Sequence, residues 1–593
     1  MILPKLNLEK VHVDDFKDIN FATENATLVS ALEEIKVLCE VEGFDTVSDV
    51  ISFVKNNAFL YIDKYEQVYS NEAILSVERL VEIISTSELV KLELVPLFNM
   101  AISKVPAQFD VQFLKDSVTA DELASDLNVL VDIAKLAVDF GALEYIFTKD
   151  IAEVNVNPAV EAVALLEELN ILTNNNKEIT AFAFNFVYDK LGINQNKRAA
   201  KVQAAEFENI NFANENAALQ EAIALIGEIK TDLQLNSLSD IMSFVNNKEY
   251  VNFEEFSALT YTHAEELIGV LVDTELAQYA LPTVFDFALD KVAAKGLDFT
   301  YLSGQFTGAE LANDVKVLVS EAVRWVRNNG IITAIKNKEI QANYVDELVL
   351  TVRALKDVNI VNKEQAKLVS FITNTLYKNV FKYTESIDES YFANVDWTGE
   401  IDAVADVLVE LGDIVETFGV KHNLLSLEGL KGFAQIAKDT TIYDQEFVAN
   451  VADVLEAITK SEALLVEAQF GIEYGIAFAS MKGIDATAIE VTDEEIAEDL
   501  VTLSDVLVKV VDANVLGFAL AGEALNQDKF DGLVEAVKDV LDLNIVQDIR
   551  TELLDFAFGK VGLVVEEDKL DAINWTEEIE VIGASRTDSG VHA

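Results

Sequence analysis

Ile19-Asn20-Phe21-Ala22-Thr23-Glu24-Asn25-Ala26-Thr27-Leu28 is the stretch that decides the fold, because it returns later in the chain. A close copy, Ile210-Asn211-Phe212-Ala213-Asn214-Glu215-Asn216-Ala217-Ala218-Leu219, follows 191 residues later (Ile19 to Ile210). A looser copy reads Val395-Asp396-Trp397-Thr398-Gly399-Glu400-Ile401, and the head of a fourth reads Ile573-Asn574-Trp575-Thr576-Glu577-Glu578-Ile579. Similarity at a long fixed period predicts an array of repeats.

A second copied block supports the same period. Ser48-Asp49-Val50-Ile51-Ser52-Phe53-Val54 matches Ser239-Asp240-Ile241-Met242-Ser243-Phe244-Val245, again 191 residues later (Ser48 to Ser239). Between these blocks, apolar residues recur at the spacing of one helical face, as in Leu28, Leu32, Ile35 and Cys39. The sequence therefore predicts helices as the building elements.

One capping box marks the middle of each of the three repeats. The boxes are Thr119-Ala120-Asp121-Glu122, Thr307-Gly308-Ala309-Glu310 and Thr492-Asp493-Glu494-Glu495. In such a box the threonine oxygen accepts from the amide three residues on, and the glutamate reaches back to the threonine amide. Gly141 and Gly330 stand where the helices that follow should end. Each repeat is thus expected to consist of two similar helical halves.

The fold class predicted is all-α: an elongated, solenoid-like array of three helical repeats of about 190 residues each. The expected divisions are 1–13 as the tail of a preceding repeat, 14–205, 206–390 and 391–571 as repeats 1 to 3, and 572–593 as the start of a fourth. Because the sequence begins with the end of one repeat and finishes with the start of another, we expect it to be a segment of a longer array.

The composition favours a folded, strongly solvated surface. Hydrophobic residues make up 51% of the 593 residues, and the formal net charge is −59. Such a charge opposes binding to nucleic acid and to anionic membrane surfaces. With 103 acidic residues, carboxylate pairs such as Glu494-Glu495 are expected to be solvated helix faces rather than general acid–base pairs.

Cysteine, histidine and glycine motifs point to no cofactor, no metal site and no small-molecule ligand. Cys39 is the only cysteine, which excludes an intrachain disulfide and a thiolate zinc site. The four histidines, His12, His263, His422 and His592, share no metal-ligand spacing. No stretch is apolar enough to predict a membrane span, and the first residues lack the features of a signal peptide.

The last residues carry a different motif, Gly583-Ala584-Ser585-Arg586-Thr587-Asp588-Ser589-Gly590-Val591-His592-Ala593. It closely resembles the active-site motif of the TruA family of tRNA pseudouridine synthases, over residues 578–593 only. The resemblance implies that Asp588 is the catalytic aspartate that attacks the uridine and that Arg586 is the basic residue paired with it, on the substrate side. The repeat and the motif meet at residues 578–584, which suggests a join of two coding sequences.

Three functions stay open at this point. The preferred one is a non-enzymatic structural or adhesive repeat protein, displayed at the surface of a bacterial cell as a fragment of a longer chain; scarce arginine hints at an AT-rich coding sequence. The second is a cytoplasmic helical scaffold that binds protein partners along a groove. The third is a tRNA pseudouridine synthase, by the terminal motif alone. In the first two, the partners are other repeats or other proteins.

The aromatic residue at the third position of the repeat has two interpretations. Phe21, Phe212, Trp397 and Trp575 each follow an apolar residue two positions earlier and come just before a helix. Each is either a plug at the joint between consecutive repeats or an ordinary core aromatic within one repeat. For a joint residue, Phe212 should pack against side chains on both sides of residue 206, and Trp397 on both sides of residue 391.

Overall fold

The computed structural model describes residues 13–46, 48–49, 52, 71–106, 109–193, 201–251, 256–296, 298–327, 343–376, 387–414, 445–481, 489, 491–513 and 527–560. Helices account for 80% of the structure, and no strand occurs in these ranges. The all-α class predicted from the sequence is therefore confirmed. The chain divides into two compact units, unit 1 (residues 1–330) and unit 2 (residues 331–593).

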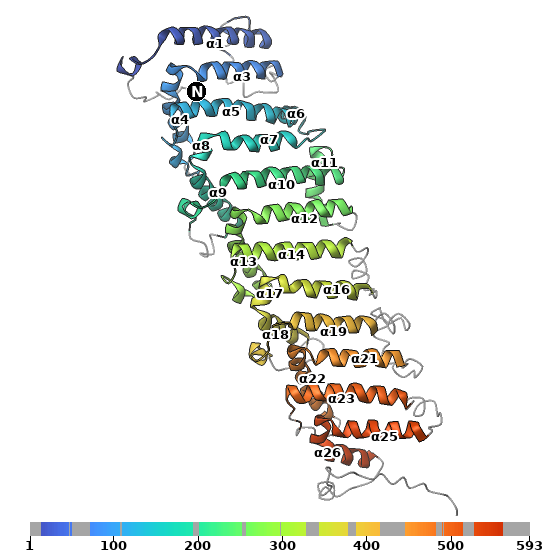
Figure 1. Cartoon of the computed structure of the whole chain (residues 1–593). Helices are drawn as coiled ribbons and strands as arrows, with labels where there is room; N and C mark the ends of the chain where they lie inside the picture. Colours follow the sequence, from blue (N-terminus) through green and yellow to red (C-terminus); the bar gives the residue numbers. More distant parts are fainter. Residues whose placement is uncertain are drawn as a thin grey trace, which may run out of the picture. The chain divides into compact units, whose positions relative to one another are not determined.

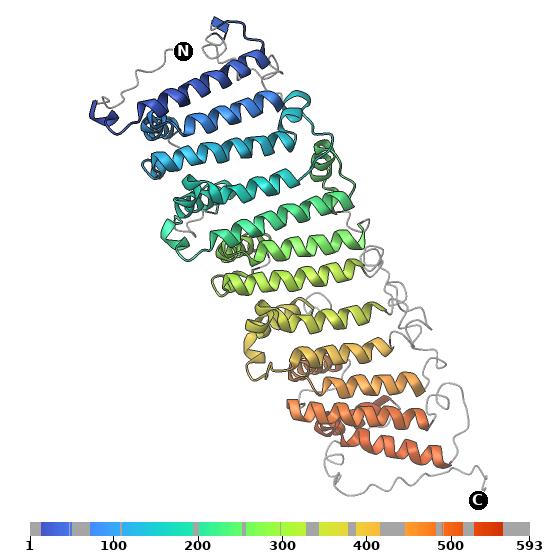
Figure 2. The ribbon, with the colours of Figure 1, turned by 45° about the horizontal axis from the view of Figure 1, so that its top comes forward.

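In unit 1, seven helices lie side by side in a row, each packed on the next (Figures 1 and 2). They are α1 (Phe21–Glu42), α3 (Asn71–Ser85), α5 (Ala120–Asp139), α7 (Asn157–Leu165), α10 (Phe212–Asp232), α12 (Ala258–Asp273) and α14 (Gly308–Arg327). Leu123 of α5, Leu225 of α10 and Leu311 of α14 are buried. In α1, the first helix of this row, the face expected from apolar spacing is not buried: Leu28, Leu32 and Ile35 are 59%, 55% and 37% exposed. The spacing thus predicts this helix correctly but not which of its residues are covered.

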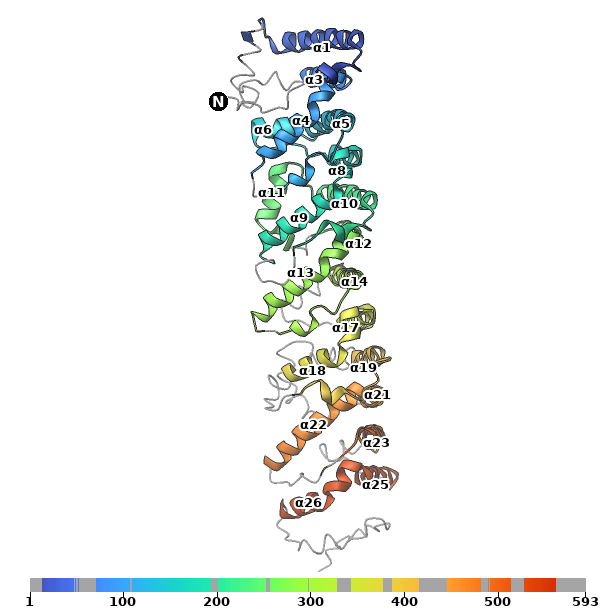
Figure 3. The same ribbon diagram turned by 90° about the vertical axis from the view of Figure 1, so that its left-hand side faces the viewer.

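A second set of helices in unit 1 covers one side of this row (Figure 3). It comprises α4 (Glu88–Lys104), α6 (Ala142–Thr148), α9 (Asn176–Leu191), α11 (Leu238–Asn246) and α13 (Glu275–Ala293). The short helix α8 (Asn170–Thr173) follows the end of α7 and lies in line with the row. Short 3-10 turns lead into several elements, among them η1 (Val13–Phe16), η6 (Leu166–Glu168) and η8 (Ala204–Phe207). Pro96 lies inside α4 and Pro282 inside α13.

Unit 2 has the same two kinds of helix. Its row consists of α16 (Asn343–Ala354), α19 (Glu400–Ile414), α21 (Gln445–Ile458), α23 (Asp493–Asp512) and α25 (Gln527–Asp542), again packed in chain order. The covering helices are α18 (Gln365–Leu376), α22 (Glu462–Met481) and α26 (Asn544–Lys560). The short helix α17 (Asn359–Lys363) follows the end of α16, and η14 (Glu389–Phe392) precedes α19.

The predicted helix starts are confirmed at all three capping boxes. Thr119 and Thr492 are the N-cap residues of α5 and α23, each with both reciprocal hydrogen bonds. Thr307 and Glu310 form the same pair of bonds at the start of α14. Gly141 follows α5 with φ of +109°, a conformation that glycine adopts without strain; Gly330 lies outside the described residues. No described helix is both long and apolar enough to cross a membrane.

Candidate functional site at the joints marked by Phe212 and Trp397

The two residues assigned by resemblance, Arg586 and Asp588, lie outside the described residues, so their roles stay a prediction. His12, His422 and His592 also lie outside the described residues. Cys39 is half-buried in α1, and burial raises the pKa of its thiol above the ordinary value. Within the ranges that the structure describes, no group of three or more His, Cys, Asp or Glu side chains is placed to hold a metal ion.

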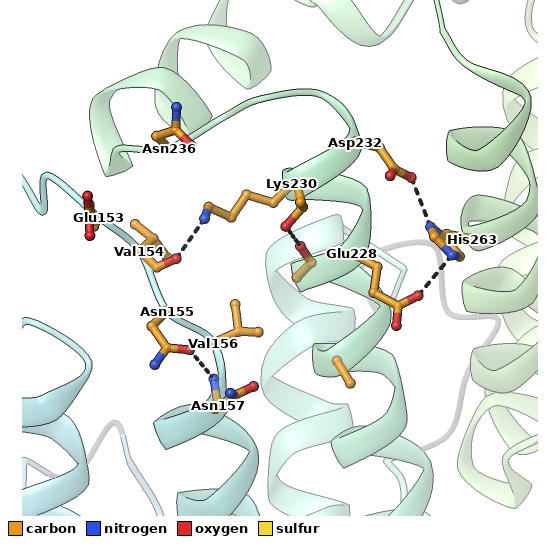
Figure 4. A pocket seen from close by; sticks show the side chains of 13 residues that line it. Glu153, Val154, Asn155, Val156, Asn157, Glu228, Lys230, Asp232, Asn236 and His263 are labelled. Atoms are coloured by element: carbon orange, nitrogen blue, oxygen red, sulfur yellow. Dashed lines mark hydrogen bonds and ion pairs between the residues drawn. The ribbon is translucent and has the colours of Figure 1, made fainter.

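One pocket in unit 1 lies where the segment before α7 crosses the C-terminal half of α10 (Figure 4). It is an open, polar hollow of about 640 Å³. Lys230 of α10 donates from Nζ to the carbonyl oxygen of Val154 at 2.7 Å. The amide of Val154 donates to the carbonyl oxygen of Asn236 at 2.9 Å. The pocket is thus framed by bonds that tie the incoming segment to α10.

His263 of α12 closes one side of the same pocket (Figure 4). Its Nδ1 lies 2.9 Å from the Asp232 carboxylate and its Nε2 lies 2.9 Å from the Glu228 carboxylate. Both acidic residues belong to α10, and the imidazole is only 14% exposed. His263, the one histidine among the described residues, therefore links two adjacent helices of the row.

Glycine makes the close contact between α7 and α10 possible. A Cβ on Gly227 would lie 2.3 Å from Cγ2 of Val156. A Cβ on Gly412, 185 residues later, would lie 3.0 Å from Cγ1 of Val345. Val345 in α16 occupies the position of Val156, so the same Val–Gly contact joins α16 to α19 in unit 2. The sequence repeat therefore extends to a contact between helices.

An aromatic cluster forms the other end of the α7–α10 region. Phe207 is 0% exposed, and its ring lies 5.5 Å from that of Phe184 in α9 and 4.8 Å from that of Tyr279 in α13. Phe212 packs against this cluster, which also includes Tyr188. Burial and the Glu206 carboxylate, which accepts from the Tyr279 hydroxyl at 2.5 Å, raise the pKa of Tyr279. Members of the cluster lie on both sides of residue 206, as expected for a joint.

Unit 2 contains the same cluster in its own residues. Phe392 is 1% exposed and packs with Phe470 of α22 and with Ile387, and Trp397 packs against them. Val369 of α18 contributes from before residue 391. In both clusters an asparagine of the preceding helix accepts from the backbone amide before the 3-10 turn: Asn185 from Val202 at 3.0 Å and Asn374 from Ile387 at 2.9 Å.

Buried glutamates fasten α1 and α19 to covering helices. Glu24 of α1 accepts from the Ser87 hydroxyl at 2.6 Å and from the Glu88 amide at 2.8 Å, at the N-terminus of α4. Glu400 of α19 does the same with Ser461 and Glu462 at the N-terminus of α22, at 2.6 and 2.8 Å. Carboxylates at helix N-termini satisfy free amides and favour the helix dipole.

Buried aspartates do the same in the second half of the repeat. Asp126 of α5 accepts from the amides of Asn170 at 2.7 Å and Ile171 at 2.9 Å. Asp499 of α23 accepts from the amides of Asn544 at 2.7 Å and Ile545 at 3.0 Å. Asp314, at the same place in α14, is 1% exposed. Sequence reasoning missed these residues, although an aspartate seven residues after each capping threonine was the available signal.

Neither a protein-family model, nor a curated protein, nor a solved structure shows significant similarity to this chain. The arguments about its role therefore rest on the geometry described above.

Proposed function

We propose that the chain is a non-enzymatic structural repeat protein, an elongated array of three helical repeats that acts as a spacer or adhesive stalk. The observation that supports it best is the joint: the cluster around Phe207 and Phe212 recurs around Phe392 and Trp397 with equivalent residues. A contact that is rebuilt at each period is what an array needs, because each repeat of a solenoid buries its faces against its neighbours.

Small-angle X-ray scattering of the whole chain tests the array. A compact protein of this length has a radius of gyration of about 25 Å. An array predicts a much larger value and the scattering of a rod, and Trp397→Ala should change the rod's bend while the helix content is retained. A radius near the compact value would contradict the proposal, since no extended stack of repeats could produce it.

We also propose that the array is displayed outside a bacterial cell as part of a longer protein. The net charge of −59 and the single cysteine fit a hydrated, disulfide-free surface stalk. Protease treatment of intact cells that produce the protein naturally is the test. Peptides from residues 14–571 should be released before lysis. Protection of the chain until the cells are broken would instead support an internal scaffold.

A further inference from the structure

The N-terminal end of unit 1 has an open apolar hollow of about 680 Å³. Phe16, Ile19 and Phe21 line it from the segment before and at the start of α1, and Leu89 lines it from α4. Phe21 is 53% exposed and Val13, at its rim, is 88% exposed. Exposed large apolar side chains gathered around one hollow mark a binding surface more often than scattered ones do.

The same four positions are covered at the next joint. Phe207, Ile210 and Phe212 stand 191 residues after Phe16, Ile19 and Phe21 (Phe16 to Phe207). Leu276 follows the N-cap of α13 as Leu89 follows the N-cap of α4. All four belong to, or pack against, the cluster that includes Ala181 and Tyr188 of α9, with Phe184 stacked on Phe207. The hollow therefore has the same kind of lining as the surface that α9 covers at the joint around Phe207.

We propose that this hollow binds an amphipathic helix of the α9 kind, contributed by a further repeat. The helix would carry the pattern of Ala181, Phe184 and Tyr188, which places three apolar side chains along one face. The proposal rests on the repeat array proposed above and names its partner. Phe184 shows how the helix would sit, with an aromatic ring stacked over Phe16 as Phe184 is stacked over Phe207.

Two observations favour a further repeat over a second copy of this chain. The α9 helix is already committed to the cluster around Phe207, so a second copy could offer it only by opening its own joint. Charge points the same way. The α9 segment balances Lys177 and Lys190 against Glu178 and Asp189, whereas two whole chains of −59 each repel one another.

A labelled peptide with the sequence of residues 176–193 tests the proposal against the whole chain. A staple between the exposed positions 183 and 187 holds it helical, which circular dichroism verifies first. Fluorescence anisotropy should show saturable binding, and Phe21→Ala in the chain should weaken it by about tenfold or more. The matched control is Leu28→Ala, because Leu28 is 59% exposed on the same helix but does not line the hollow. It should leave the affinity within about twofold.

Several results would overturn the proposal. They are the absence of saturable binding, equal losses for Phe21→Ala and Leu28→Ala, or equal binding by a peptide with Phe184→Ser and Tyr188→Ser. Sedimentation velocity of the chain alone measures whether it forms a dimer. A dimer that Phe21→Ala dissociates would mean that a second copy fills the hollow. Scattering from the unliganded chain tests the array itself, so failure of the peptide and failure of the array are distinguishable.

Discussion

Two glutamates at the same position of the repeat differ in their partners. Glu24 accepts from a hydroxyl as well as an amide, since Ser87 points its hydroxyl at the carboxylate. At the corresponding joint Thr274 donates its hydroxyl to the Leu271 carbonyl, and Glu215 receives backbone amides only. The Ser87 bond lowers the pKa of Glu24 below its ordinary value of 4.5. Burial, together with repulsion by Glu275, raises the pKa of Glu215.

These opposite shifts predict opposite pH dependences. The Glu24 carboxylate contributes stability that is present above pH 4.5 and is lost as the pH falls through its folded pKa. The Glu215 carboxylate carries a cost above its folded pKa that is relieved as the pH falls toward 4.5. Relative to Glu24→Gln, the wild type should lose stability below pH 4.5. Relative to Glu215→Gln, it should gain stability between pH 7 and 4.5. Urea denaturation across this range measures both, and parallel curves would contradict the account.

Gly227 should tolerate no side chain. Gly227→Ala forces a methyl against Val156 and should cost about 1–3 kcal/mol, as overpacking does. Gly269, inside α12, is the control because its added Cβ would meet nothing within 4 Å. Gly269→Ala should be neutral or stabilise by up to about 1 kcal/mol through the helix propensity of alanine. Thermal unfolding of the two variants decides the matter, and equal effects would show that the contact with Val156 is loose.

Residue patterns in the sequence predicted the capping threonines because their partners are three residues away. The glutamate and aspartate caps could not be predicted in the same way. Glu24 and Ser87 are distant in the chain, and only the packing of α4 against the start of α1 brings them together. In an acidic chain, nothing in the neighbouring sequence distinguishes a carboxylate that will be buried from the many that stay exposed. Its recurrence in every repeat is the sole sequence signal, and only the fold gives that recurrence a meaning.

At the scale of the helix, row and covering layer are held together by carboxylates at helix N-termini. Asp126 is 2% exposed and accepts three hydrogen bonds, from the Asn170 amide, the Asn170 side chain and the Ile171 amide. Loss of such an acceptor leaves buried donors without partners, and this costs more than the bonds contribute when they are present. These links decide where each covering helix begins.

Removing the Asp126 carboxylate should loosen the segment that it holds at the start of α8. Asp126→Ala should destabilise unit 1 by about 2–4 kcal/mol, because it strands amides at the start of α8. Asp132→Ala is a matched control on the same helix, with a side chain that is 50% exposed and only an i,i+3 ion pair to Lys135 to lose. It should change stability by under about 1 kcal/mol. Similar losses for both variants, measured by urea denaturation, would count against the link.

Some helix boundaries were predictable from apolar spacing. The apolar spacing of the sequence predicts helices from about residue 71 to 85 and from about 527 to 543, and α3 and α25 match these ranges almost to the residue. The same spacing predicts a helix from about Ala181 to Gly192, but its start is wrong, since α9 begins at Asn176. Asn175, the residue before it, makes no side-chain cap bond to the helix, so the local signal was weak. Which helices form the row and which cover it could not be predicted, because that depends on contacts between distant segments.

At the scale of the molecule, stability should be distributed joint by joint rather than held in one core. Within each unit the helices of the row pack on one another in chain order, and the repeated clusters around Phe207 and Phe392 carry the largest fully buried side chains. The array that we propose is quasi-one-dimensional, and in such proteins stability is a sum of repeat terms and nearest-neighbour terms. A change at one joint should therefore act locally, on the helices that meet there.

Hydrogen exchange with and without Phe207→Ala tests the central claim most directly, namely that the aromatic joint couples the helices on its two sides. Truncating this fully buried ring should cost about 3 kcal/mol or more, which accelerates exchange through local opening by about a hundredfold. The account predicts faster exchange in both α9 and α13, with α5 unchanged. Faster exchange in α13 alone, with α9 as protected as in the wild type, would contradict it.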